Sequence, residues 1–132
     1  MSTDPSLALQ AGFLHAIVAA VPVLGGRVYD MPPASALYPY VTIGEIQVNA
    51  DLADCYAGSE SFADVHVWSR AVGFPEAKGI ADQIRSALHD ADLALSGHSL
   101  ELLQFRDART LRDPDGITSH IAMTFRALTQ PD

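Results

Sequence analysis

The chain has 132 residues, 48% of them hydrophobic and 18% charged, and this composition predicts one globular domain over residues 1–132 and excludes a largely disordered chain. Sixteen acidic and eight basic residues give a formal net charge of -8, which argues against tight nucleic-acid binding because such binding needs a basic surface. The single cysteine excludes an intrachain disulfide, and the first residues predict neither a signal peptide nor a membrane span.

Apolar residues at helical spacing predict a first helix over residues 6–20, with Pro5 in its first turn. Its predicted apolar stripe consists of Leu7, Ala11, Leu14, Ile17 or Val18, and Val21. A short strand over residues 27–29 and a longer strand over residues 40–48 follow, because both segments are rich in β-branched and aromatic residues. Gly44 is expected to mark a β-bulge in the longer strand.

The centre of the chain predicts a strand over residues 61–69 and then a helix over residues 75–88. Alternation along the strand directs two valines toward one face and His66 and Trp68 toward the other, so both faces are expected to be at least partly covered. The helix has one continuous apolar stripe at three- and four-residue spacing, and Pro75 suits its first turn.

The last third of the chain predicts a strand over residues 100–105, extending as far as residue 111, and a turn at residues 113–116 that contains Pro and Gly. The strand after this turn alternates cleanly, and its expected buried face consists of Ile117, Ile121, Met123 and Phe125. Residues 130–132 are expected to fray. The order of elements predicts an α+β fold, with a mainly antiparallel sheet and helices packed on one face.

Residues 49–60 predict a loop that is longer than most connections in a compact domain, and such loops often carry function. Leu52 and Tyr56 are large side chains that the core does not require, so we expect them to contact another protein. Trp68 has two interpretations, an interface anchor or a core residue beneath a helix, and the core interpretation is preferred.

Three groups of residues could support chemistry, and each has a simpler interpretation. Cys55 could be a nucleophile, but its acidic neighbours disfavour a thiolate, and a small loop or buried cysteine is preferred. His66 and His120 could form a metal pair, but no third ligand has a typical spacing, so two ordinary sheet histidines are preferred. A turn accounts fully for Asp113 and Asp115, which lack the other carboxylates of a calcium loop. We therefore predict no catalytic residue, no cofactor and no metal.

Several short motifs occur in a characteristic order and spacing along most of the chain. They are Pro39-Tyr40-Val41, Val65-His66-Val67-Trp68-Ser69, Gly73, Glu76-Ala77, Ile80-Ala81, Ala87-Leu88, Gly97, the turn from Asp113 to Gly116, His120, and Phe125-Arg126-Ala127. In this order the motifs resemble the tail-completion, or tail-terminator, proteins of long-tailed phages and of gene transfer agents. Each motif alone is short, and the resemblance rests on their succession.

The resemblance implies a structural virion protein at the head-proximal end of the tail, assembled in the bacterial cytoplasm. Such a protein caps the tail tube, ends tube polymerisation and joins the tail to the head-tail connector or stopper protein, typically as a hexameric ring. DNA would pass through the ring without specific binding, and the acidic balance of the chain suits such a passage because it disfavours sticking. No membrane is implied, and the family has no catalytic residues to carry over.

Two other functions remain open at this point. One is a related head-tail connector component such as a stopper or neck protein, and the other is a small cytoplasmic enzyme that uses Cys55 or the two histidines. For an assembly protein, the residues that the sequence favours as interface candidates are Asp51, Leu52, Asp54, Tyr56, Asp113 and Asp115.

Overall fold

The computed structural model describes residues 3–51 and 58–132. Within them the elements follow in the order α1 (Ser6–Ala20), η1 (Pro22–Leu24), β1 (Val28–Tyr29), β2 (Tyr40–Asp51), β3 (Gly58–Ser69), α2 (Pro75–Leu88), β4 (His98–Arg112) and β5 (Ser119–Pro131). The prediction of an α+β fold is confirmed, and the bounds of the two predicted α-helices agree with those observed.

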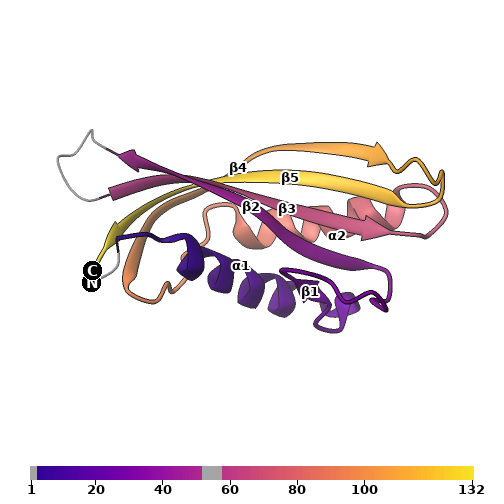
Figure 1. Cartoon of the computed structure of the whole chain (residues 1–132), viewed down its shortest axis with the longest axis horizontal. Coiled ribbons are helices and arrows are strands. Elements are labelled where there is room, and N and C mark those ends of the chain that lie inside the picture. Colours follow the sequence, from indigo (N-terminus) through magenta and orange to yellow (C-terminus); the bar gives the residue numbers. More distant parts are fainter. Residues whose placement is uncertain (1–2, 52–57) are drawn as a thin grey trace.

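The strands form one sheet in the order β1-β2-β3-β5-β4 (Figure 1). β1 pairs with β2 in parallel, and the other three pairings are antiparallel. Figure 1 shows α1 and α2 side by side on the same side of the sheet. The prediction of a mainly antiparallel sheet with helices on one face is therefore confirmed, and the opposite face has no helix among the described residues.

The core lies between the sheet and the two helices. α2 contributes the apolar stripe that its spacing predicts, with Ala77, Ile80, Ala81, Ile84 and Leu88 all buried. At the centre, the rings of Phe13 from α1 and Phe125 from β5 meet edge to face, with centroids 5.8 Å apart. Neither ring is exposed to solvent. Burial of a side chain of this size stabilises a fold by roughly 1.5–3 kcal/mol relative to leaving it exposed.

The buried face of α1 agrees with the predicted stripe only in part. The second half of the stripe is confirmed, because Ile17 and Val21 are buried, but the first half is wrong. Leu7 is 78% exposed and Ala11 is exposed, and Leu9 and Phe13 are buried instead. The physical reason is that residues 5–26 contain no charged side chain, so no polar face marks which side of the helix should meet solvent. The large ring of Phe13 takes the core position instead. No helix in the described part of the chain is long and apolar enough to cross a membrane.

The strands are longer than predicted at several ends. β2 continues to Asp51 and β3 begins at Gly58, so strand pairing takes up both ends of the predicted 49–60 loop. The expected fraying of residues 130–132 is wrong, because Pro131 pairs with His98 in the sheet. Asp132 N also donates a hydrogen bond to the carbonyl oxygen of Gly97, in the turn before β4, at 3.0 Å. The expected bulge near Gly44 is confirmed by a shift of register in β2.

The start of β5 also differs from the prediction. Ile117 was expected on the buried face, but it lies in the turn before β5 and is 62% exposed. Thr118 is buried in its place, at 2% exposure. The apolar alternation in the sequence wrongly includes Ile117 because the turn does not end at residue 116. It continues through Ile117 and Thr118, whose backbone N–H groups donate hydrogen bonds to Asp115.

Candidate interaction surfaces

The sheet has one face that no described helix covers, and we call it the helix-free face. It carries the even-numbered residues of β3 and β5, which are partly exposed except for Gly58, whereas most odd-numbered residues of these strands are buried against α1 and α2. The prediction that Trp68 lies in the core beneath a helix is wrong. Trp68 is even-numbered and lies on the helix-free face, where it is partly buried by neighbouring aromatic rings.

Aromatic and imidazole rings form a row across this face. The rings of Trp68 and His120 stack with centroids 3.8 Å apart and planes 10° from parallel. Tyr40 stacks on the other side of Trp68 at 6.3 Å, and Trp68 Nε1 donates a hydrogen bond to Thr42 Oγ1 at 3.1 Å. These contacts join β2, β3 and β5 across the face, so the row stiffens the sheet without help from a helix.

His66 and His120 lie on the helix-free face, as the alternation predicts, and their rings face each other. His66 Nδ1 and His120 Nε2 are 2.8 Å apart, so one imidazole donates a hydrogen bond and the other accepts it. Burial lowers the pKa of both histidines, and the proximity of His66 lowers the pKa of His120 further. The pair is therefore held uncharged near neutral pH. No group of three or more His, Cys, Asp or Glu in the described residues could hold a metal ion.

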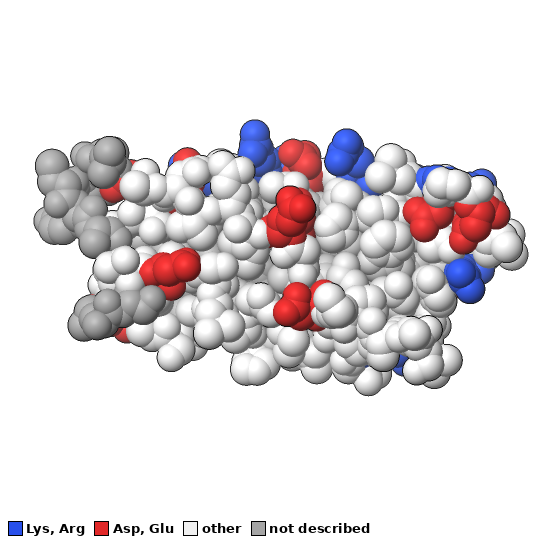
Figure 2. Space-filling view, in the orientation of Figure 1, with Lys and Arg blue, Asp and Glu red and all other residues white. Residues whose placement is uncertain are grey.

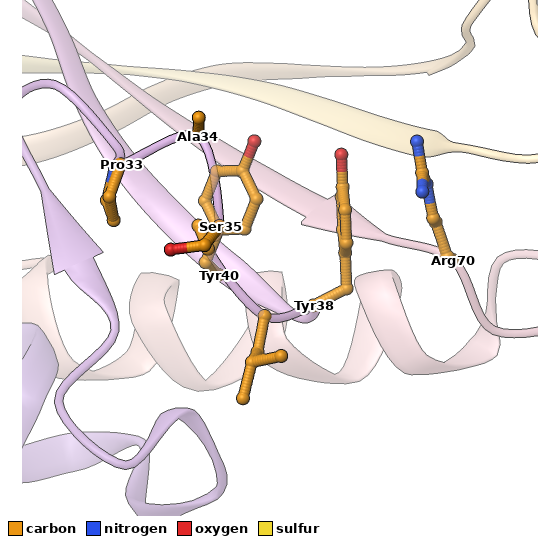
Figure 3. A pocket seen from close by; sticks show the side chains of 8 residues that line it. Pro33, Ala34, Ser35, Tyr38, Tyr40 and Arg70 are labelled. Carbon is orange, nitrogen blue, oxygen red and sulfur yellow. The ribbon is translucent and has the colours of Figure 1, made fainter.

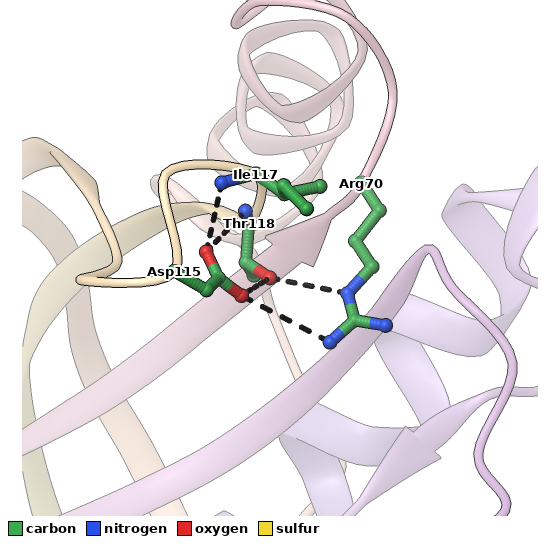
Figure 4. Close-up of polar contacts among 4 residues, drawn as sticks. All are labelled: Arg70, Asp115, Ile117 and Thr118. Atoms are coloured by element: carbon green, nitrogen blue, oxygen red, sulfur yellow. Dashed lines mark hydrogen bonds and ion pairs between the residues drawn. The ribbon is translucent and has the colours of Figure 1, made fainter.

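The turn between β4 and β5 is fixed by the carboxylate of Asp115 (Figure 4). Asp115 Oδ1 accepts hydrogen bonds from the backbone N–H groups of Ile117 and Thr118, both at 2.8 Å, and Oδ2 accepts one from Thr118 Oγ1 at 2.7 Å. These donors lower the pKa of Asp115 to about 2. Arg70 adds a contact from the loop after β3, with its Nη2 3.9 Å from Oδ2. The carboxylate is thus committed to the turn, which excludes the calcium-loop interpretation for Asp115.

A shallow hollow of about 300 Å³ lies beside this turn, between the loop before β2 and the loop after β3 (Figure 3). Figure 3 shows the side chains of Tyr38, Tyr40 and Arg70 pointing in the same direction along one side of it. The Arg70 guanidinium lies 4.5 Å from the centroid of the Tyr38 ring. Burial and the neighbouring Tyr38 raise the pKa of Tyr40 to about 12, so its phenol stays protonated. Ser35 also lines this hollow, but none of the lining residues is a His, Asp, Glu, Cys or Lys that could activate its hydroxyl.

The same end of the sheet exposes large apolar side chains. Val72 is 99% exposed and Ile117 is 62% exposed, and both line a second hollow of about 470 Å³. Met31 and Leu37, in the loop before β2, are 86% and 69% exposed. We call residues 30–38, 70–73 and 113–118 the turn end of the molecule. Exposed apolar side chains gathered at one end are typical of a surface that meets another protein.

The predicted interface residues do not form one cluster. Asp113 and Asp115 lie at the turn end, whereas Asp51 lies at the opposite end of the sheet, where it pairs with Gly58. Leu52, Asp54 and Tyr56 lie outside the described residues, as does Cys55. Sequence reasoning missed the exposed apolar residues of the turn end. The available signal was Val72, an apolar residue in the short connection between the predicted strand that ends at residue 69 and the predicted helix that begins at residue 75.

Charge is distributed unevenly over the surface. Figure 2 shows Lys and Arg side chains along the upper margin of the molecule, beside β4 in the view of Figure 1, and few charged side chains over α1. Three of the eight basic residues of the chain fall within residues 106–112 of β4. By contrast, no Lys or Arg occurs between Arg27 and Arg70, a stretch that contains β1, β2 and β3. The sheet is therefore basic along one edge and acidic along the other.

Comparison with known proteins identifies relatives of this fold. The family model described as tail completion protein gp17 matches residues 12–130. A chain in the structure "Virion of native gene transfer agent (GTA) particle" is 32% identical, with a TM-score of 0.85 and coverage of 97% of this chain and 98% of that chain. The structure of bacteriophage SPP1 gp17 protein is 25% identical, with a TM-score of 0.60 and coverage of 92% of this chain and 88% of that one. No curated protein sequence matches the chain.

The family match spans most of the chain and the structural similarity extends over nearly its whole length. The expected resemblance to tail-completion proteins is confirmed by both comparisons. The family is structural and non-enzymatic, in agreement with the predicted absence of enzymatic activity. This chain belongs to the tail completion protein gp17 family and is a structural tail component of a phage or a phage-like particle.

Proposed function

We propose that this protein caps the head-proximal end of the tail tube, ends tube polymerisation and joins the tail to the head-tail connector. The observation that carries the proposal is the similarity, over 97% of the chain, to a chain of a gene transfer agent virion, together with the tail-completion family match. The working form is a hexameric ring around the DNA channel. Its partners are the tail tube protein on one side and the connector or stopper protein on the other.

The separation of the candidate interface residues fits two partners stacked on opposite sides of a ring. The turn end offers exposed Val72 and Ile117 beside Asp113 and Asp115, and we assign it to one partner. The opposite end of the sheet carries Asp51. We assign this end, with Leu52, Asp54 and Tyr56 from outside the described residues, to the other partner. A cap between a tube and a connector needs two such separate surfaces.

The net charge of -8 suits a ring through which DNA passes. DNA is densely negative, so acidic side chains around a channel repel it and prevent it from sticking to the wall. In this proposal DNA is a passing cargo and not a bound ligand. The particle carries the protein at the junction of head and tail.

The test is the tail-length distribution, by electron microscopy, of particles assembled without this gene. The proposal predicts overlong or headless tails, and normal lengths once the protein is supplied from a plasmid. Tails of normal length that fail to join heads would instead support a connector role one layer higher. Normal, joined particles would contradict both roles. A plasmid that carries Val72→Asp tests the turn end separately, because the exposed side chain should matter for docking and not for folding.

A further inference from the structure

The sheet has two open edges among the described residues. β1 has two residues and pairs only with Val41 and Thr42, so residues 44–51 of β2 have no strand on their outer side. β4 is the last strand at the opposite edge. Unpaired backbone groups along a strand edge favour pairing with another strand, and proteins usually cover such edges or use them. The two edges are candidate contact surfaces for other chains.

Only the second half of β4 is open. Asp90 N donates a hydrogen bond to Leu103 O at 2.8 Å, and Phe105 N donates one to His89 Nδ1 at 3.0 Å, so the segment after α2 covers the first half of this edge. No such hydrogen bond from the described residues covers residues 106–112, and all seven of them are exposed. The open part of β4 is therefore about as long as the open part of β2.

The two open edges carry opposite charge. Residues 106–112 contain three arginines and Asp107, whereas residues 44–51 contain Glu45, Asp51 and no basic residue. Two of these three arginines lie over aromatic rings of the same chain, Arg106 over Phe62 at 4.8 Å and Arg112 over Phe74 at 4.5 Å. Arg109 is exposed and forms no ion pair with any described residue. Glu45 is likewise exposed.

We propose that the β4 edge of one copy, residues 106–112, binds the β2 edge of the next copy, residues 44–51, and that this contact closes the ring. The inference rests on the ring in the proposed function and names the surfaces that build it. A β4 edge against a second β4 edge would bring arginines together, and two β2 edges would bring acids together, so the charges disfavour a two-fold pairing. Head-to-tail pairing is the arrangement that closes a ring by rotation.

Strand direction fits this contact. Three antiparallel pairings separate β2 from β4, so the two strands run antiparallel within one sheet. A sheet that continues from the β4 edge of one copy to the β2 edge of the next therefore pairs the strands antiparallel, the more stable arrangement. The open edges are offset along the strands by about five residues, or roughly 17 Å at 3.4 Å per residue. An offset at every contact is what strands tilted around a closed ring require.

Charge reversal at the two edges tests the proposal. In this antiparallel pairing residue 112 lies opposite residue 45, with residue 109 three positions away. The double variant Arg109→Glu and Arg112→Glu alone, and Glu45→Arg alone, each place like charges in every contact, and we expect more than a tenfold fall in the fraction of rings measured by native mass spectrometry. An equimolar mixture of the two variants should restore rings, because alternation of the two proteins gives opposite charges at all contacts of an even-numbered ring. Lys78→Glu and Asp82→Arg on exposed positions of α2 are the matched controls, and neither should change the ring fraction.

The same variants are then expressed in the host, where the yield of joined particles is the second readout. This readout applies even if the tube is needed for ring formation. Recovery with both variants together, but with neither alone, is the expected result. No recovery on mixing, or full assembly by each variant alone, would overturn the edge contact. Either result leaves the terminator role to the tail lengths of the gene deletion, so the two proposals fail separately.

Discussion

The two faces of the sheet belong to the same strands, but different interactions hold them together. On the face toward α1 and α2, Phe13, Phe125 and the stripe of α2 are buried, and their packing accounts for the fold. On the helix-free face, side chains remain partly exposed and are joined by ring stacking and hydrogen bonds, as in Trp68 with His120. Contacts between side chains therefore order the helix-free face although these side chains remain partly exposed, and the face stays available to other chains.

The largest expected effect comes from truncation of the buried face. Phe125→Ala removes a fully buried ring that contacts Phe13, and we expect a loss of about 3–5 kcal/mol in the free energy of unfolding. Phe62→Ala, in β3 on the helix-free face, should cost less than about 1.5 kcal/mol because its ring is partly exposed. Urea denaturation of both variants measures the difference. Equal losses would show that the two faces contribute alike.

A smaller effect is expected at Gly44 in β2. A Cβ at this position would lie 2.7 Å from His66 Nε2, so Gly44→Ala must displace His66 and disturb its hydrogen bond to His120. We expect a loss of about 1–3 kcal/mol. Gly79→Ala is the matched control, because no atom lies within 4 Å of its added Cβ and alanine favours a helix by about 1 kcal/mol. Opposite signs of the two changes in thermal unfolding would support the close contact on the helix-free face.

The smallest effect concerns pH. Because burial lowers the pKa of His66 and His120, the uncharged rings favour the folded state, and this stability is present above the ordinary histidine pKa near 6.5. It should be lost as the pH falls below that value toward the lowered pKa values. The double variant His66→Asn and His120→Gln keeps nitrogen or oxygen near both contacting atoms without titrating. Its unfolding free energy should fall less than that of the wild type between pH 7 and 5.5, and an equal fall would place the pH effect elsewhere.

The helix bounds could be predicted because proline and spacing mark them in the sequence. α2 also has a polar face that shows which side is buried. α1 has no charged residue, so the sequence predicted Ile17 and Val21 correctly but missed Leu9 and Phe13. Trp68 was misplaced because both faces of β3 carry apolar residues, so alternation alone could not tell which face the helices cover.

The candidate surfaces were predicted less completely than the fold. The absence of basic residues between Arg27 and Arg70 is visible in the sequence, and so are the arginines of residues 106–112. That these segments form opposite edges of one sheet depends on the strand order, which no local pattern specifies. The acidic loop around Asp51 and the turn at residues 113–116 were identified from composition, but only the structure separates them to opposite ends of the sheet.

The most direct test of a ring-forming terminator is a reconstruction, by electron cryomicroscopy, of the head-tail junction in joined particles. We expect one layer of six copies at the head-proximal end of the tube, with residues 106–112 of each copy against residues 44–51 of the next. The turn end and the opposite end of each sheet should contact different partners. Copies spread along the tube would contradict the terminator role, and a single layer whose copies meet through the helix-covered side would contradict the edge contact.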